Sequence, residues 1–306
     1  MTLFSREQVL NRLKQGHSFH QAELSRIDLH DTNLDKANFV EAYLKGANLA
    51  QASGKEADFT RANLMFALCS GTNLTQARLY QTEFNGASLE GVNLQAANAE
   101  KANFHDTTFK DVNATLIKLE AADLSESQAT DSNFSGANLN RAKLIKVNYH
   151  QVNFSGAQLE EAIGSAAQFT QISLRDANLG KAKFIQSSFM ESDLTQASLI
   201  AADFSQAKFH KVSLQQADLL EANFKSAKLT EVDLTEASLF DVDFEGATLS
   251  QVNLTDANLQ EANLENTIWE DVNFSGCNVA GAIFTNAQGL SEEQKQWLQE
   301  NGGLNI

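Results

Sequence analysis

The chain has 306 residues, a net charge of −16, no proline and two cysteines. This acidity excludes the basic footprint that direct binding to nucleic acid requires. The sequence has no apolar stretch of about 18 residues and no charged leader followed by an apolar run, so we expect neither a membrane span nor a signal peptide.

The first predicted element is a short helix over residues 5–15. Ser5 and Gln8 have the spacing of a capping box, apolar residues follow at helical spacing, and Gly16 favours the end of the helix. Because the open end of a β-sheet structure needs cover against aggregation, we interpret residues 1–16 as an N-terminal capping helix.

A five-residue period then runs without a slip from Phe19 to Phe284. Of its 54 central positions, 28 are Leu and 17 are Phe, and 31 of the positions two residues earlier are Ala. Period five matches neither the 3.6-residue repeat of a helix nor the two-residue repeat of a strand. It indicates a chain that turns a corner after each short extended segment and buries its apolar side by stacking on its neighbours.

The repeated motif A-[N/D]-[L/F]-x-x, as in Ala-Asn-Phe-Val-Glu at residues 37–41, resembles the pentapeptide repeat family over residues 17–286. The resemblance implies an all-β solenoid, a right-handed quadrilateral β-helix with four pentapeptides per coil, and hence about 13 coils. Centres four pentapeptides apart should then stack, which predicts one column containing Phe184, Phe204, Phe224 and Phe244 at the spacing of adjacent strands.

Residues 287–306 are predicted to form a C-terminal capping helix and tail. Ser291 and Gln294 repeat the capping box, and Trp297 and Leu298 lie on one side of a helix of about ten residues. Two interpretations stay open, an end cap and a dimer contact. The second comes from the resemblance, because gyrase-protecting members of the family pair through their C-terminal ends. We therefore expect a monomer or an end-to-end homodimer.

No residue pattern points to catalysis. The six His share no column on adjacent coils, and the sequence has no metal-binding spacing, phosphate-binding loop or nucleophile elbow. We therefore expect no enzyme activity, no metal and no cofactor. Cys69 and Cys277 both occupy inward positions on distant coils, which predicts buried, reduced thiols and a cytoplasmic location.

The negative charge is concentrated towards the C-terminus. Residues 201–306 hold 5 Lys or Arg and 17 Asp or Glu, whereas residues 1–200 hold 18 and 22. Residues 230–289 hold 11 acidic residues and no basic one, which over three coils is ~0.8 charge per Å against ~0.6 for duplex DNA. This segment is either a solvated face that keeps the protein soluble or a mimic of DNA, as in acidic family members that occupy the DNA-binding saddle of gyrase.

One outward column breaks the polar pattern. Ile200, Leu220 and Phe240 follow their centres at intervals of one coil. They either mark a contact or are sheltered by neighbouring side chains. Together with the acidic residues near them they form the candidate interaction surface, whose members are Ile200, Leu220, Phe240, Glu231, Asp233, Asp241, Asp243, Glu245, Asp256, Glu261, Glu265, Glu270 and Asp271.

The favoured function is a non-enzymatic scaffold or adaptor that presents β faces to a protein partner. One alternative is an acidic DNA-mimicking regulator of DNA gyrase, of another topoisomerase or of another DNA-binding protein. A second alternative, an accessory protein of a bacterial secretion system, comes only from the resemblance.

Overall fold

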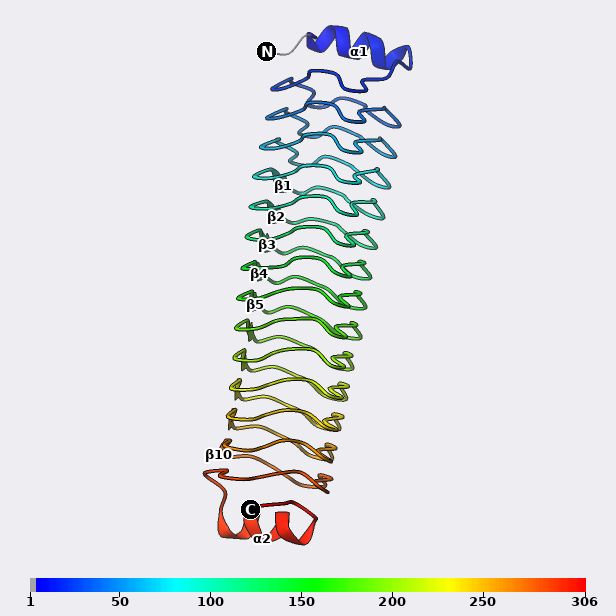
Figure 1. Cartoon of the computed structure of the whole chain (residues 1–306). Helices are drawn as coiled ribbons and strands as arrows, with labels where there is room; N and C mark the ends of the chain where they lie inside the picture. The colour runs from blue at the N-terminus through cyan, green and yellow to red at the C-terminus, as the bar shows by residue number, and fades with distance from the viewer. Residues whose placement is uncertain (1–3) are drawn as a thin grey trace. The chain divides into compact units, whose positions relative to one another are not determined.

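The computed structural model describes residues 4–306, so the first three residues of the predicted N-terminal segment lie outside the described part. The chain is a parallel β-solenoid with a short helix at each end, α1 (Arg6–Lys14) and α2 (Glu292–Glu300) (Figure 1). Its coils group into two compact units, one up to Gln158 and one from Leu159 to Ile306. The five-residue period therefore predicted the fold class correctly.

Each coil takes four pentapeptides in both units. In the first unit Glu23 is bridged to Tyr43 in parallel, and in the second Ser198 is bridged to Asp218. Such bridges recur at intervals of one coil within each unit. A coil therefore consists of four short extended segments, one for each pentapeptide.

The motif satisfies every backbone N–H of a pentapeptide, as residues 62–66 illustrate. The alanine donates to the preceding centre and closes a turn, the next residue donates to the previous coil, and the centre donates to the following coil. The residue after the centre donates to the side-chain oxygen of Asn63, and the last residue donates again to the following coil. These bonds measure 2.7 to 3.1 Å. Where Asn or Asp precedes the centre, as here, its side chain accepts the one N–H that the coils leave over.

Every corner places its last residue in the left-handed region. All residues at five-residue intervals from 21 to 286 have a positive φ, such as 53° at Gln21 and 59° at Asn286. Most of these residues are not glycine, although this conformation is unfavourable for an L-residue by about 1–2 kcal/mol. The conformation persists because the flanking residues of each corner are fixed by coil-to-coil hydrogen bonds.

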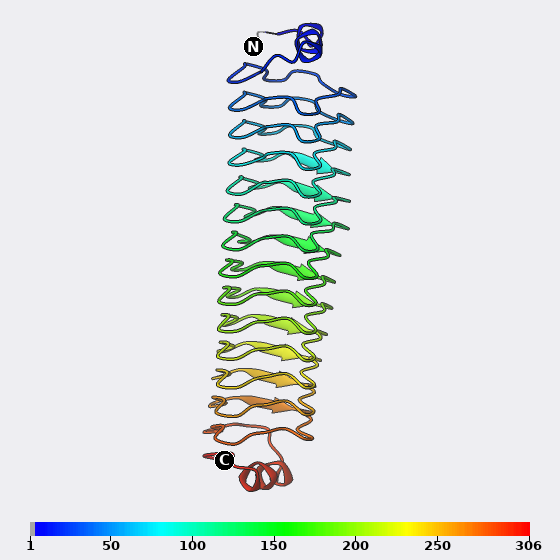
Figure 2. The same ribbon diagram turned by 90° about the vertical axis from the view of Figure 1, so that its right-hand side faces the viewer.

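On one side of the coils the segments form regular three-residue strands (Figure 2). In each unit, consecutive strands pair in parallel with an offset of one coil, as in Ser88↔Thr108 and Lys208↔Lys228. The first unit contains β1 (Ser88–Glu90), β2 (Thr108–Lys110), β3 (Gln128–Thr130) and β4 (Asn148–His150). The second contains β5 (Gln168–Thr170), β6 (Ser188–Met190), β7 (Lys208–His210), β8 (Lys228–Thr230), β9 (Thr248–Ser250) and β10 (Ile268–Glu270).

The solenoid has about nine turns built with regular strands, fewer than the 13 coils predicted. Before Ser88 and after Glu270 the same one-coil offset continues, but isolated bridges replace the strands. The sequence supplies a reason: Asp28 and Asn48 hold the amide two residues later at 3.3 and 3.1 Å, whereas all the strands except β4 begin with a residue other than Asn or Asp. Without that side-chain acceptor the segment stays extended.

The core consists of the centres and the small residues two positions before them. The predicted phenylalanine column is confirmed, because the ring centroids of Phe184 and Phe204 lie 5.8 Å apart and those of Phe204 and Phe224 lie 5.2 Å apart. Where a centre is Gly164, the ring of Phe184 occupies the space that a larger side chain would fill. The stack therefore stays packed at an irregular centre.

Both predicted capping boxes are present. Ser5 and Gln8 exchange hydrogen bonds at the start of α1, and Ser291 and Gln294 do so at the start of α2. Val9 and Leu298 are the buried residues of the two helices. Each helix therefore covers the apolar end of its own unit (Figure 1).

Candidate functional site

The apolar column of the candidate surface runs along three successive coils of the second unit. Ala201, which follows Ile200, donates its N–H to the carbonyl of Leu220 at 2.8 Å, and Glu221 donates to that of Phe240 at 3.0 Å. The three apolar side chains therefore stack at coil spacing. Each of the three side chains is half-buried, because the residue after a centre lies partly against the neighbouring coils. Neighbouring side chains therefore shelter part of this apolar surface, and the rest is exposed to solvent.

A column of carboxylates lies at the corner beside this apolar column. Its members are Glu221, Asp241 and Glu261, which are exposed and have no ion-pair partner within the part of the chain that the structure describes. Glu221 was missed in the sequence-based surface, although the one-coil offset from Asp241 could have identified it. We call Ile200, Leu220, Phe240 and these three carboxylates the C-terminal strip.

The remaining acidic candidates do not join the C-terminal strip. The one-coil offset puts them on other sides and corners of the coils, so the acidic segment surrounds the solenoid instead of charging one face. These residues are Glu231, Asp233, Asp243, Glu245, Asp256, Glu265, Glu270 and Asp271.

Several of these carboxylates are already engaged. Lys225 contacts Asp243 at 3.0 Å and Glu245 at 3.1 Å, and its pKa is raised by the hydrogen bond to Asp243 and then by that to Glu245. Glu231 lies 4.0 Å from Lys211. The run without lysine in the sequence is therefore partly neutralised by lysines from the preceding coil.

Asp233 is held by hydrogen bonds instead of an ion pair. Burial would raise the pKa of Asp233, but hydrogen bonds from Thr235, Gln215 and Asn253 outweigh it and leave the pKa below its usual value. Glu270 accepts a hydrogen bond from Ser250 at 2.9 Å. Both side chains therefore stabilise the coil stack in addition to charging the surface.

The two thiols lie in the interior as predicted. Cys69 and Cys277 are both buried and free, and burial raises the pKa of each thiol to about 12. A thiol with such a pKa stays protonated at neutral pH and is a poor nucleophile or metal ligand. Within residues 4–306, His, Cys, Asp and Glu form no group of three or more that could hold a metal ion.

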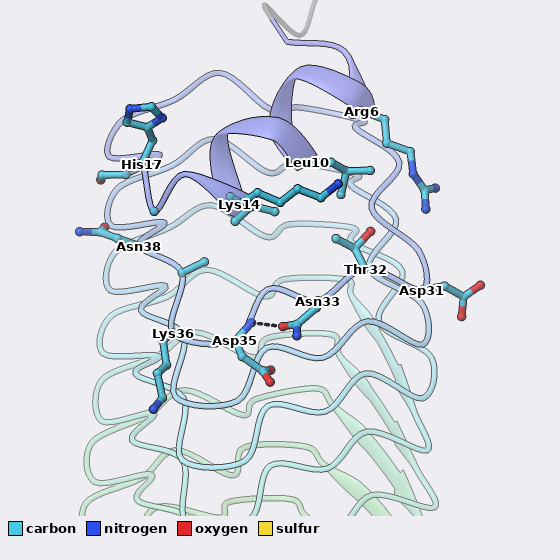
Figure 3. A pocket seen from close by; sticks show the side chains of 14 residues that line it. Arg6, Leu10, Lys14, His17, Asp31, Thr32, Asn33, Asp35, Lys36 and Asn38 are labelled. Atoms are coloured by element: carbon cyan, nitrogen blue, oxygen red, sulfur yellow. Dashed lines mark hydrogen bonds between the residues drawn. The ribbon is translucent and has the colours of Figure 1, made fainter.

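A cavity of about 730 Å³ lies between α1 and residues 31–38 (Figure 3). Arg6 and Lys14 contribute positive charge to its lining, and Asp31 and Asp35 contribute negative charge. The cavity is thus a space of mixed charge under the end cap, and its lining favours no single kind of ligand.

Among the described residues, neither helix has the length and hydrophobicity of a membrane span.

Two family models match the sequence. The model for the pentapeptide repeat region matches residues 164–239 and 217–290, and the model for pentapeptide repeats (8 copies) matches residues 18–51, 57–95, 87–125 and 115–148. Together these matches cover most of the solenoid.

Several solved structures are similar to the chain. QnrB1, a plasmid-mediated fluoroquinolone resistance protein, aligns with 18% identity and a TM-score of 0.42 over 63% of this chain and 96% of its own. A pentapeptide repeat protein from the Arabidopsis thaliana thylakoid lumen aligns with 34% identity and a TM-score of 0.30 over 37% and 76%. HetL of Nostoc sp. strain PCC 7120, involved in heterocyst differentiation regulation, aligns with 23% identity and a TM-score of 0.21 over 92% and 97%. No curated protein matches the sequence.

Proposed function

The chain belongs to the pentapeptide repeat family, and from this premise we propose that it is a non-enzymatic scaffold whose C-terminal strip binds a protein partner. The observation that carries the proposal is the pairing of two adjacent columns, one apolar and one of unpaired carboxylates, which share the coils of Leu220 and Phe240. A partner with an apolar groove and a basic rim matches both columns.

The two columns have different roles in this proposal. Leu220 and Phe240 supply affinity, because removing apolar surface from water contributes about 25 cal/mol per Å². Glu221, Asp241 and Glu261 steer the approach of a basic partner, because exposed charges change the association rate more than the final affinity.

The proposal is tested by capturing binding partners from cell extract and identifying them by mass spectrometry. A Leu220→Glu/Phe240→Glu variant should fold normally and lose the partner. The control is Thr60→Glu/Tyr80→Glu, which adds the same charge to the same column of the first unit and should keep it. Unchanged capture by the first variant would place the functional face elsewhere.

A second experiment separates the carboxylates from the apolar column. Replacing Asp241 and Glu261 by Lys should slow the association with the captured partner, and the effect should shrink as salt rises. Asp243→Asn is the control, because Asp243 is engaged by Lys225. Equal association rates for all three proteins would remove the steering role.

DNA mimicry is the second candidate, favoured by the charge density of residues 230–289. The contacts of Lys225 with Asp243 and Glu245 weaken it, because they reduce that density. A supercoiling assay with DNA gyrase distinguishes the candidates: a mimic inhibits or protects the enzyme at stoichiometric concentration, whereas the proposed scaffold leaves supercoiling unchanged.

A further inference from the structure

The first unit exposes a surface of the opposite chemistry. Tyr43, Phe66 and Leu68 are 51%, 53% and 53% exposed, which is unusual in a solenoid whose outward positions are mostly polar. Tyr43 and Leu68 precede their centres, and Phe66 lies at a corner, so no single column contains all three. Arg26 and Lys45 line the same cavity as Phe66, while Tyr43 lies two residues before Lys45 and Leu68 two residues after Phe66. We call these five residues the aromatic–basic patch.

Two glycines shape this patch. The ring of Phe66 lies over Gly86, where an added Cβ would be 2.6 Å from the ring, and the stem of Arg26 lies 3.5 Å from the Cβ position of Gly46. A cavity of about 510 Å³ is lined by Ser25, Arg26, Lys45, Gly46 and Phe66. The patch is therefore a hollow with an aromatic wall and a basic rim.

The two cations of the rim are available for a partner. Lys45 lies 5.6 Å from the centroid of the Phe66 ring, and neither Lys45 nor Arg26 has an ion pair among the described residues. By contrast, Arg61 lies 3.5 Å from Glu41, and Lys36 lies 3.8 Å from Glu56. Positive charge at the rim is thus directed towards solvent.

We propose that the aromatic–basic patch of one molecule binds the C-terminal strip of a second copy of this chain. The hollow offers the Phe66 ring and two free cations, Arg26 and Lys45, to the apolar and acidic columns of the C-terminal strip, so this inference rests on the proposed function and identifies its partner. Leu220 and Phe240 face the aromatic wall, and Arg26 and Lys45 pair with the free carboxylates of the C-terminal strip. Because one surface meets a different one, the contact either closes into a dimer when made twice or extends into chains.

The association should be weak. Each copy carries a net charge of −16, and this long-range repulsion opposes the local attraction. A contact of this kind falls in the class of small interfaces, with a Kd of about 1–100 μM. Sedimentation velocity of the full chain up to about 300 μM covers that range.

The test exchanges charges between the two surfaces. Arg26→Glu/Lys45→Glu reverses the rim, and Asp241→Lys/Glu261→Lys reverses the carboxylate column. Each variant alone should raise the Kd for self-association at least about 10-fold, because like charges then face each other. A one-to-one mixture should associate again, because the intact rim of one variant meets the intact carboxylate column of the other, and the two reversed surfaces are also complementary in charge.

Lys55→Glu/Lys118→Glu is the matched control, with the same change in net charge on two lysines outside the patch that have no ion pair within residues 4–306. It should associate like the wild type apart from the effect of net charge, and circular dichroism should show all variants folded. A wild type that stays monomeric throughout the range, or a mixture that stays monomeric, overturns the self-association.

Two outcomes distinguish this inference from the proposed function. If the wild type is monomeric but Leu220→Glu/Phe240→Glu loses a different captured protein, the C-terminal strip keeps its role and only the identity of the partner is wrong. If the wild type associates and only the patch variant affects association, the C-terminal strip is not the surface that the patch binds, and this inference is wrong.

Discussion

The aromatic–basic patch and the C-terminal strip are built on the same repeated backbone, yet they differ in exposure. Phe66 at a corner is 53% exposed, whereas Phe240, one position after its centre, is half-buried. The difference arises because a corner residue projects away from the coil, and a residue next to the centre lies against the coils on either side. Position within the pentapeptide, as much as residue type, thus decides how much apolar surface a partner can reach.

In contrast to the surface, the buried core should respond alike to the same substitution in the two units. Phe204→Ala in the second unit and Phe39→Ala in the first each remove a ring stacked on both sides, and each should lower the free energy of unfolding by about 3–5 kcal/mol. Urea denaturation followed by circular dichroism measures both. A loss below about 1 kcal/mol in either variant would mean that its stack collapses onto the gap.

Alanine at two corner glycines should separate backbone strain from side-chain displacement. Gly246→Ala at φ +68° meets only the Ser226 hydroxyl at 3.5 Å and should cost about 1 kcal/mol. Gly86→Ala at φ +64° must also displace the ring of Phe66, so it should cost about 1 kcal/mol more and weaken self-association. Equal losses in urea denaturation would show that the ring moves freely, and that the hollow is not a fixed shape.

The two thiols should differ in their rate of labelling. Cys69 is fully buried inside the first unit, and Cys277 is 7% exposed in the coil beside α2. Because the pKa of each is about 12, both should react slowly at pH 8, and Cys277 should react first through local opening near the chain end. A time course with a thiol reagent on Cys69→Ser and Cys277→Ser variants measures each alone. Faster labelling of Cys69 would mean that the coil around Cys69 opens more readily than the coil near the C-terminus.

The smallest expected effect concerns the attachment of α1. Arg6 donates a hydrogen bond to the carbonyl of His30 at 2.7 Å and lies 3.6 Å from Asp28. The pKa of Asp28 is lowered, first by its hydrogen bond with His30. A lowered folded-state pKa gives stability that is present above the unfolded pKa and lost as pH falls through the folded value.

Asp28→Asn should therefore lower the Tm slightly at pH 7, and its difference from the wild type should shrink as the pH falls below about 3.9, the pKa of an unfolded aspartate. Asp31→Asn is the matched control on the neighbouring turn and should have a smaller effect. A difference between wild type and Asp28→Asn that persists at low pH would assign it to packing instead of charge.

The sequence predicted what depends on the repeat and missed what depends on side chains of the neighbouring coil. The stacking of Phe204 on Phe224 followed directly from the register, and so did the capping box at Ser291. The contacts of Lys225 with Asp243 and Glu245 join different coils, so a linear run of acidic residues overstated the free charge. The aromatic–basic patch was missed because Arg26, Lys45 and Phe66 are far apart in the sequence and line one cavity only when successive coils stack.

The complete use of backbone N–H groups within each coil also governs how such a chain can change length. Removing one whole coil leaves every remaining side chain on its original side, with the same kind of donor and acceptor above and below it. Removing a single pentapeptide also preserves the backbone pairing, but it turns every later residue to the next side of the coil. Gene duplication or deletion in steps of one pentapeptide can therefore rearrange the surface of this protein while its interior stays the same.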